Sequence, residues 1–296
     1  MTRAEQQPLL IVIAGPTASG KTDFAIELAQ HYQTEILSAD SRQLYREISV
    51  GTAKPSAEQL ASVPHHFINH CSIHDTYNAG IFEKEAIHVL EKLFLKHKAA
   101  ILVGGTGLFL KAVCEGLDEL PKANEALREQ LQEELRTYGV DSLFDKLKNL
   151  DPEGSKTVDA KNPHRIMRAV EIALETGKSH LNLKTKSKIK RPFNIVKIFM
   201  DIDRTELYTR INNRVDSMME LGLLEEVRSV YPFKHLNALN TVGYSELFNF
   251  LDGQCLLEEA VLKIKQHTRN YAKRQLTWFR KDEDFVMHHS YKKSEW

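Results

Sequence analysis

The segment from Gly15 to Thr22 carries the clearest chemical signal in the chain. It reads GPTASGKT and matches the phosphate-loop pattern G-x-x-x-x-G-K-[ST] at every required position. Glycines let such a loop curl so that its backbone N–H groups point at phosphate oxygens, while Lys21 adds a positive charge and Thr22 offers a hydroxyl to Mg²⁺. The pattern therefore predicts a site for a diphosphate or a triphosphate, without distinguishing the two.

The flanking residues favour the strand and the helix that such a loop requires. Residues 9–14 form an uninterrupted apolar run, which is typical of a strand buried on both faces. A helix is expected from about Lys21 to Tyr32, and its positive N-terminus would face the same phosphate. Because a strand precedes the loop and a helix follows it, a chance glycine-rich turn is a poor alternative.

Two further predicted strands end in residues that could take part in chemistry. Residues 35–40 read EILSAD and end at Asp40, and the apolar run 99–103 is followed by GGTG, which contains Thr106. Strands that alternate with helices imply a parallel sheet, and ligands of such sheets bind at the carboxyl ends of the strands. The phosphate loop, Asp40 and Thr106 are therefore expected to converge. The alternative for Asp40 is an ordinary turn or helix-cap residue.

The residues after the 99–103 strand argue against an ATP-driven motor. Phosphate-loop ATPases usually end such a strand with an acidic residue that holds Mg²⁺, and here two glycines and a threonine follow. A small-molecule kinase stays open as an alternative, because Asp40 would supply the acid after the second strand.

Composition restricts the remaining function classes. Forty basic residues balance forty acidic ones among 296, so any preference for nucleic acid must be local. The three cysteines are far apart, which favours a reducing compartment without structural disulfides. Four histidines within residues 65–74 have no recurring metal-site spacing and favour a substrate-loop or surface role. No apolar run is long enough for a membrane span or a signal peptide, so a cytoplasmic protein is expected.

The character of the chain changes at about residue 119. Helical patterns over 124–138, 140–149 and 162–175 replace the strand-like runs, and strand composition returns at 193–201. We therefore expect an α/β core made of residues 1–118 and 192–296, with residues 119–191 inserted as a helical domain.

The last predicted helix, about 256–281, has a local excess of positive charge. Residues 263–281 contain seven Lys or Arg and no acid, with Tyr271, Trp278 and Phe279 among them. Basic and aromatic side chains together suit a polyanion with unstacked bases. The alternative is that the aromatic side chains are core residues and the basic ones are merely solvated.

Long segments of the chain resemble one known family in the family's own order. These segments are GPTASGKT at 15–22, SADSRQLY at 38–45, GTAKP at 51–55, HH at 65–66, GGTG at 104–107, NPHRIMRAVE at 162–171, the Arg204-to-Glu225 pattern, GYSEL at 243–247 and TRNYAKRQLTWFR at 268–280. They resemble the bacterial tRNA dimethylallyltransferases of the tRNA isopentenyltransferase family. The match spans nearly the whole chain, so it does not depend on the phosphate loop alone.

The resemblance implies a P-loop kinase-like core with a helical insertion, Mg²⁺ as the cofactor, and a monomeric enzyme without membrane contact. Its substrates would be dimethylallyl diphosphate and the anticodon arm of tRNA. The enzyme would transfer the dimethylallyl group to the exocyclic amine of the adenosine next to the anticodon and release diphosphate. Three alternatives stay open at this point: prenylation of free adenine nucleotides, a small-molecule kinase, and a non-catalytic RNA-binding module.

The resemblance also implies roles for individual residues. Asp40 corresponds to the general base, Thr106 to a threonine near the reacting groups, and Arg214 to an arginine that contacts the diphosphate, with Arg210 as the alternative. Diphosphate-binding residues would be Gly15, Thr17, Ala18, Ser19, Gly20, Lys21 and Thr22, with Thr22 also a metal ligand. Contacts with tRNA would involve Asp40, Ser41, Arg42, Gln43, Thr106, Arg128, Asn162, His164, Arg165, Arg168, Arg269, Lys273 and Arg274.

Overall fold

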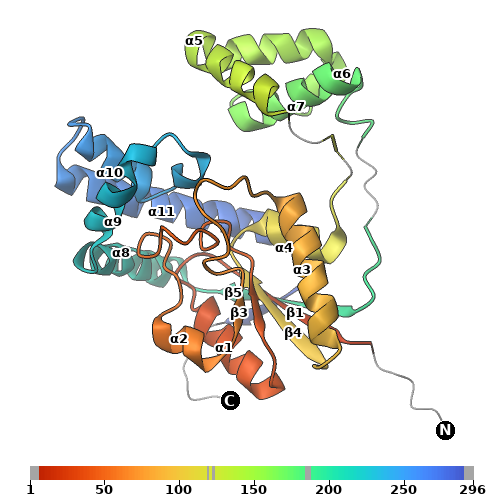
Figure 1. The fold of residues 1–296 in the computed structure, drawn as a ribbon, viewed down its shortest axis with the longest axis vertical. Coiled ribbons are helices and arrows are strands. Elements are labelled where there is room, and N and C mark those ends of the chain that lie inside the picture. The colour runs from red at the N-terminus through yellow and green to blue at the C-terminus, as the bar shows by residue number, and fades with distance from the viewer. Residues whose placement is uncertain (1–6, 119, 122–123, 184–187, 290–296) are drawn as a thin grey trace. The chain divides into compact units, whose positions relative to one another are not determined.

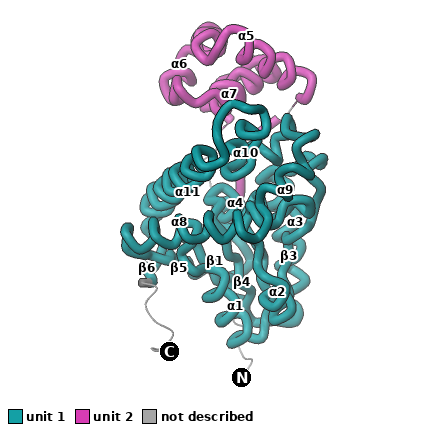
Figure 2. The backbone as a smooth tube through the Cα atoms, turned by 90° about the vertical axis from the view of Figure 1, so that its left-hand side faces the viewer, with its two compact units in different colours: residues 1–115, 190–296 teal, residues 116–189 magenta. Residues whose placement is uncertain are grey.

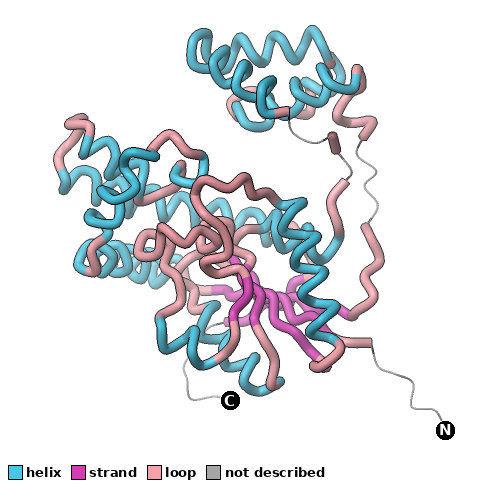
Figure 3. The backbone as a smooth tube through the Cα atoms, viewed as in Figure 1, coloured by secondary structure: helices cyan, strands magenta, loops and turns pink. Residues whose placement is uncertain are grey.

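The structure is a computed structural model of the chain and describes residues 7–118, 120–121, 124–183 and 188–289. The chain divides into two compact units (Figure 2). Unit 1 consists of residues 1–115 and 190–296, and unit 2 of residues 116–189. Unit 2 contains helices and no strand within its described residues, whereas unit 1 contains the sheet (Figure 3).

Within the described residues, unit 1 is built on one six-stranded sheet in which every pair of neighbours is parallel (Figure 1). The strand order is β3-β2-β4-β1-β5-β6. The parallel α/β sheet predicted from the sequence is thus confirmed. The strands are β1 Leu9–Ala14, β2 Ile36–Ser38, β3 His65–His66, β4 Ala99–Gly104, β5 Asn194–Asp201 and β6 Phe285–His289.

Helices fill the connections between the strands. The helices of unit 1 are α1 Lys21–Tyr32, α2 Ala57–Ser62, α3 Ala79–Phe94, α4 Gly107–Glu115, α8 Arg204–Glu220, α9 Leu223–Val230, α10 Tyr244–Leu251 and α11 Leu257–Phe279, with short 3₁₀ turns η1 Tyr231–Phe233 and η2 Asn237–Leu239. Those of unit 2 are α5 Glu125–Leu150, α6 Pro152–Ser155 and α7 Pro163–Thr176. Among the described residues, no helix is both long enough and apolar enough to cross a membrane.

Strand β1 is buried because both faces of the sheet are covered. Its side chains alternate between the faces. Ile11 and Ile13 pack with α1 residues in one cluster, while Leu10 and Val12 join the larger core that includes Phe82 of α3. This two-sided burial explains why the strand reads as a continuous apolar run rather than as an alternating one.

Unit 2 has its own small core between α5 and α7. Leu131, Leu147 and Val170 are at most 1% exposed, whereas Leu174, which the helical spacing places on the buried stripe, is 43% exposed. The two helices predicted for 124–138 and 140–149 form one element, α5, that is interrupted at Gly139, where φ is 80°.

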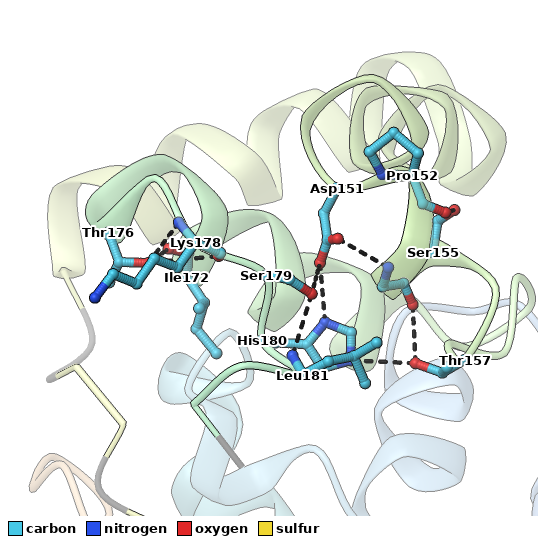
Figure 4. A network of polar contacts seen from close by, with 11 residues as sticks. Asp151, Pro152, Ser155, Thr157, Ile172, Thr176, Lys178, Ser179, His180 and Leu181 are labelled. Carbon is cyan, nitrogen blue, oxygen red and sulfur yellow. Dashed lines mark hydrogen bonds and ion pairs between the residues drawn. The ribbon is translucent and has the colours of Figure 1, made fainter.

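A buried carboxylate joins two segments of unit 2 (Figure 4). Asp151 accepts hydrogen bonds from the Gly154 N–H at 2.8 Å and from Ser179 Oγ at 2.7 Å, and its Oδ2 lies 3.3 Å from Nδ1 of His180. Burial pushes the pKa of Asp151 up, but these hydrogen bonds outweigh it and hold the pKa below its ordinary value. The contact joins the start of α6 to the segment that follows α7.

Candidate active site

A cavity of about 980 Å³ opens in unit 1 at the carboxyl ends of the central strands. Its lining includes residues 17–23 after β1, residues 40–43 after β2, and Gly104 and Gly105 at the end of β4. Residues of helices α8 and α11, and of the segments 51–55 and 240–246, form other parts of the wall. The structure therefore brings together the strand ends that the sequence expects to converge.

The phosphate loop lies between β1 and α1, as the motif requires. Gly20, at the N-cap of α1, has φ of 87°, a left-handed conformation that glycine adopts without strain. Ser19 Oγ is buried and has no hydrogen-bond partner among the described residues. A buried hydroxyl of this kind is costly unless a ligand accepts its hydrogen bond, and a phosphate oxygen would do so.

Two cations lie close together beside this loop. Lys21 Nζ donates to the Pro16 carbonyl oxygen at 2.5 Å, and Arg214 Nη1 donates to Thr17 Oγ1 at 3.2 Å. Burial of the ammonium group, and then the positive charge of Arg214, lower the pKa of Lys21 from 10.5 to about 7, although Asp40 opposes them. Burial likewise lowers the pKa of Arg214. A bound anion would relieve both effects.

The structure separates the two arginines that the sequence left as alternatives. Arg214 lines the cavity and contacts the phosphate loop. Arg210 is exposed one turn away and forms an ion pair with Glu206 at 2.6 Å. The geometry therefore favours Arg214 as the arginine that faces a bound anion.

Asp40 and Thr106 lie at adjacent strand ends that are joined by hydrogen bonds. Asp40 Oδ1 accepts from the backbone N–H groups of Arg42 at 2.9 Å and Gln43 at 3.3 Å, so Asp40 does form the turn that the alternative reading expects. Thr106 Oγ1 accepts from the Ser41 N–H at 3.0 Å, which connects the loop after β4 to the loop after β2. Asp40 also lines the cavity, so the turn and a role in the site coexist.

Tyr271 is a site residue that the sequence analysis names only as an aromatic of the basic helix. Its side chain lines the cavity. Burial, followed by the negative charge of Asp40, raises the pKa of Tyr271 to about 12. The phenol is therefore neutral beside Asp40 at neutral pH.

The side chains after Asp40 that were expected to contact tRNA have partners within the protein. Arg42 donates to the carbonyl oxygens of Asn237, Ala238 and Asn240. Gln43 Nε2 donates to the carbonyl oxygens of residues 52 and 53. These contacts hold the loops around the cavity in place.

Glu226 is a second residue that the sequence analysis did not identify. Its carboxylate accepts hydrogen bonds from three consecutive backbone N–H groups, those of Ser49, Val50 and Gly51, at 2.6, 2.8 and 2.9 Å. It also accepts one from the hydroxyl of the fully buried Tyr244 at 2.5 Å. Glu226 thereby anchors the 49–55 loop, part of which lines the cavity.

Helix α11 has basic side chains both at the cavity and away from it. Lys263 and Arg274 line the cavity, whereas Lys273 is exposed and Arg269 donates to Asn212 Oδ1 at 2.6 Å. Arg269 and Lys273 also lie over the ring of Tyr208, at 5.9 and 6.0 Å from its centroid. Each alternative for this helix is thus partly right, because Phe279 is a core residue and Lys273 is solvated, while Arg274 and Tyr271 line the cavity.

The candidate residues of unit 2 fall into two groups. Arg128 and Arg168 contact the carboxylate of Glu171, which is 0% exposed, at 2.8 Å each. Asn162 caps α7 by accepting a hydrogen bond from the Arg165 N–H. The side chains of His164 and Arg165 are exposed.

The oxygen ligands at the cavity suit Mg²⁺. Thr22 lines it and provides a hydroxyl, one of the hard oxygen ligands that this ion prefers. The acidic group of Glu115, Asp282 and Asp284 is different, because the ammonium group of Lys197 lies 2.6 Å from Asp282. Within the described residues, the histidines of 65–74 form no metal-ligand group.

The fold and the cavity define the class: a phosphate-loop α/β protein with a cationic cavity at the strand ends. Residues 43–282 match the family described as IPP transferase. The chain is 54% identical over 273 residues to the tRNA dimethylallyltransferase of Christiangramia forsetii, covering 92% of this chain and 90% of that protein.

Solved structures give the same result. The full-length tRNA isopentenylpyrophosphate transferase of Bacillus halodurans matches with a TM-score of 0.71 and 36% identity, over 96% of this chain and 90% of that one. A eukaryotic dimethylallyltransferase described as acting on tRNA matches with a TM-score of 0.80 and 26% identity, over 98% of this chain and 75% of that one. The chain belongs to the IPP transferase family. It is an enzyme of the tRNA dimethylallyltransferase type, and the comparisons give no support to the kinase or free-nucleotide alternatives.

Proposed function

We propose that this enzyme, acting as a monomer, transfers a dimethylallyl group from dimethylallyl diphosphate to the exocyclic amine of the adenosine next to the anticodon of tRNA. The observation that carries the proposal is the pair of desolvated cations, Lys21 and Arg214, in the same cavity as the carboxylate of Asp40. An anionic leaving group and a proton acceptor are the two features that this reaction requires.

The phosphate-loop side of the cavity stabilises the departing diphosphate. As the bond between the allylic carbon and the diphosphate oxygen breaks, negative charge accumulates on the diphosphate. Lys21, Arg214 and the N-terminus of α1 are already in place to receive it, and preorganised electrostatic stabilisation of this kind is usually the largest catalytic effect. Gly15, Thr17, Ala18, Ser19, Gly20 and Thr22 complete the proposed diphosphate site.

The Asp40 side of the cavity receives the proton. The exocyclic nitrogen of adenine attacks the allylic carbon, and the new nitrogen–carbon bond leaves an extra proton on that nitrogen. Asp40 takes this proton, an effect typically worth about 10² to 10⁴-fold. Thr106 and the neutral phenol of Tyr271 lie beside Asp40 and can orient the base.

Thr22 is the residue that would hold Mg²⁺. When bound, the ion would neutralise part of the charge on the diphosphate.

Exposed basic side chains on both units supply contacts for the tRNA backbone. On α11 these are Lys273 and Arg274, which lie within one helical turn of Gln275 and Tyr271. Neutralising backbone phosphates in this way supports binding without base specificity. The target adenosine must leave its stack to reach the cavity, at a cost of a few kcal/mol. Unit 1 would contribute Asp40, Ser41, Arg42, Gln43, Thr106, Arg269, Lys273 and Arg274, and unit 2 would contribute Arg128, Asn162, His164, Arg165 and Arg168.

A transfer assay tests the proposal directly. The full chain is incubated with Mg²⁺, labelled dimethylallyl diphosphate and tRNA from cells that lack this modification, with AMP in a parallel reaction. We expect label in tRNA, on the adenosine next to the anticodon, and little in AMP. Label in AMP alone, or phosphate transfer from ATP without prenyl transfer, would refute the proposal.

The variant Asp40→Ala tests the assigned base. Transfer to tRNA should fall by about 10² to 10⁴-fold, because the proton acceptor is lost. Binding of dimethylallyl diphosphate, measured by calorimetry, should stay within a few fold of wild type, since Lys21 and Arg214 are retained. A variant that lost diphosphate binding to the same extent as transfer would contradict the role assigned to Asp40.

A further inference from the structure

The side chain of Gln275 joins two loops of the active site that follow different strands. It extends from α11 and is 6% exposed. Its Oε1 accepts a hydrogen bond from the Thr17 N–H at 2.9 Å, and its Nε2 donates one to the Gly105 carbonyl oxygen at 2.9 Å. Thr17 belongs to the phosphate loop after β1, and Gly105 follows β4 and precedes Thr106.

The two backbone partners allow one orientation of the amide. A backbone N–H only donates and a carbonyl oxygen only accepts, so a flipped amide would place two donors together and two acceptors together. Glutamate would lack the donor, and asparagine is one methylene shorter. The contact therefore depends on the chemistry and on the length of glutamine.

Gly105 leaves the room that this contact needs. A Cβ atom at position 105 would lie 2.2 Å from Gln275 Nε2. The nearest atom outside that side chain, the Gly15 carbonyl oxygen, would be 3.8 Å away, an ordinary contact distance. The backbone at Gly105 is not left-handed, so it is the Gln275 amide that excludes a side chain here.

We propose that Gln275 is a positioning residue for prenyl transfer. It sets the separation between the phosphate loop, where the diphosphate binds, and the Asp40–Thr106 pair, where the amine loses its proton. The inference rests on the proposed function. Thr106, the next residue after Gly105, accepts a hydrogen bond from the Ser41 N–H at 3.0 Å. A shift of Gly105 therefore moves the Asp40 loop relative to the phosphate loop. A displacement of about 1 Å between reacting groups can cost on the order of 10²-fold in rate.

The variant Gln275→Met removes both hydrogen bonds and keeps the length and burial of the side chain. We expect the single-turnover rate of prenyl transfer to fall about 10- to 100-fold, while the KM for tRNA and the melting temperature stay close to wild type. A residue that only supports the fold would lower the melting temperature and tRNA binding together with the rate. Gln30→Met, the same change at an exposed position of α1, is the matched control and should leave the rate unchanged.

A double-mutant cycle with Gly105 tests the contact itself. Gly105→Ala should slow transfer as Gln275→Met does, because its methyl group displaces the amide. Combined with Gln275→Ala, the same methyl group enters vacated space, so the double variant should be no slower than Gln275→Ala alone.

The Gln275 and Gly105 variants together decide whether Gln275 is a positioning residue. A wild-type rate in Gln275→Met, or a Gly105→Ala effect that is the same with and without Gln275, would overturn the inference. If Gln275→Met is too unstable to assay, the Gly105 variants still provide the test. Failure of the wild-type protein to modify tRNA would refute the proposed function instead, which separates the two hypotheses.

Discussion

Two pairs of cations in this enzyme differ in how their charge is balanced. In the active-site cavity, Lys21 and Arg214 lie close enough for the charge of Arg214 to lower the pKa of Lys21. In unit 2, Arg128 and Arg168 share the carboxylate of Glu171, which accepts hydrogen bonds from Nε and Nη2 of Arg128 at 2.8 and 3.0 Å and from Nη1 of Arg168. The Arg128 and Arg168 side chains are 40% and 29% exposed, and only this second pair has a buried acid between its members.

This difference in charge balance distinguishes cations that bind a ligand from cations that stabilise the fold. Desolvated positive charge in excess is unfavourable in the free protein, and it becomes favourable when a ligand brings negative charge. The unit 2 pair needs no ligand, because Glu171 is buried between the arginines. Burial would raise the pKa of Glu171, but hydrogen bonds from Arg128 and Arg168 outweigh it and lower the pKa. The tRNA contacts expected of these arginines stay predictions.

Replacement of Lys21 should give the largest effect. In Lys21→Met we expect the single-turnover rate with saturating dimethylallyl diphosphate to fall about 10² to 10³-fold, because one preorganised donor to the leaving group is lost. The melting temperature should not fall, since the variant removes a desolvated charge. Lys96→Met, at an exposed position after α3, is the matched control. A Lys21→Met rate within tenfold of wild type would show that the cavity does not work through its excess charge.

Replacement of Glu171 should affect stability rather than chemistry. In Glu171→Gln the two arginines face a neutral amide. We expect unfolding free energy to fall by about 2 to 3 kcal/mol, less than the roughly 3 to 5 kcal/mol of a fully buried pair, because the Arg128 side chain is 40% exposed. Urea unfolding and hydrogen exchange of unit 2 amides measure this loss of unfolding free energy.

The control for Glu171 is an exposed ion pair on the same unit. Glu133 and Arg136 are 64% and 76% exposed, so Glu133→Gln should change stability within experimental error. Equal effects of Glu171→Gln and Glu133→Gln would contradict a framework role for Glu171.

Much of the fold could be predicted because its signals are local. The apolar run at 9–14, the glycines of the phosphate loop and the Asn162–Pro163 start of α7 each act within a few residues, and the structure places all three as expected. Strands β3 and β6 were missed. The first has two residues, and the second is short and partly polar, so neither has a pattern that differs from a loop.

The residues that hold the active-site loops in place could not be predicted, because their hydrogen-bond partners are backbone atoms far away in the sequence. Gln275 is 258 positions from Thr17, and Glu226 is about 175 positions from the N–H groups that it binds. A backbone N–H has no residue type, so no sequence pattern marks it as a partner. The balance of Arg128 and Arg168 by Glu171 likewise depends on packing that spacing alone does not reveal.

Diphosphate binding should also depend on pH, through the protonation of Lys21. The pKa of Lys21 is about 7 in the free protein, against an ordinary value of 10.5. A bound diphosphate favours the charged lysine and raises this pKa. Below about pH 7 Lys21 is already charged, whereas above it the free protein must take up a proton to bind. The affinity for dimethylallyl diphosphate should therefore fall by up to tenfold per pH unit as pH rises from 7 toward the pKa of the complex.

Calorimetry at pH 8 in two buffers with different ionisation enthalpies measures this proton uptake. We expect wild type to take up close to one proton more than Lys21→Met, in which the group is absent. Titration of the ligand's own phosphates is common to both proteins, so the difference isolates Lys21. Arg214, which also faces the loop, is retained in both. Equal uptake would mean that Lys21 is already charged in the free protein at this pH. The active-site cations would then not carry excess charge that destabilises the free protein, and in that respect they would not differ from the arginines that Glu171 neutralises, even if Lys21 proved essential for transfer.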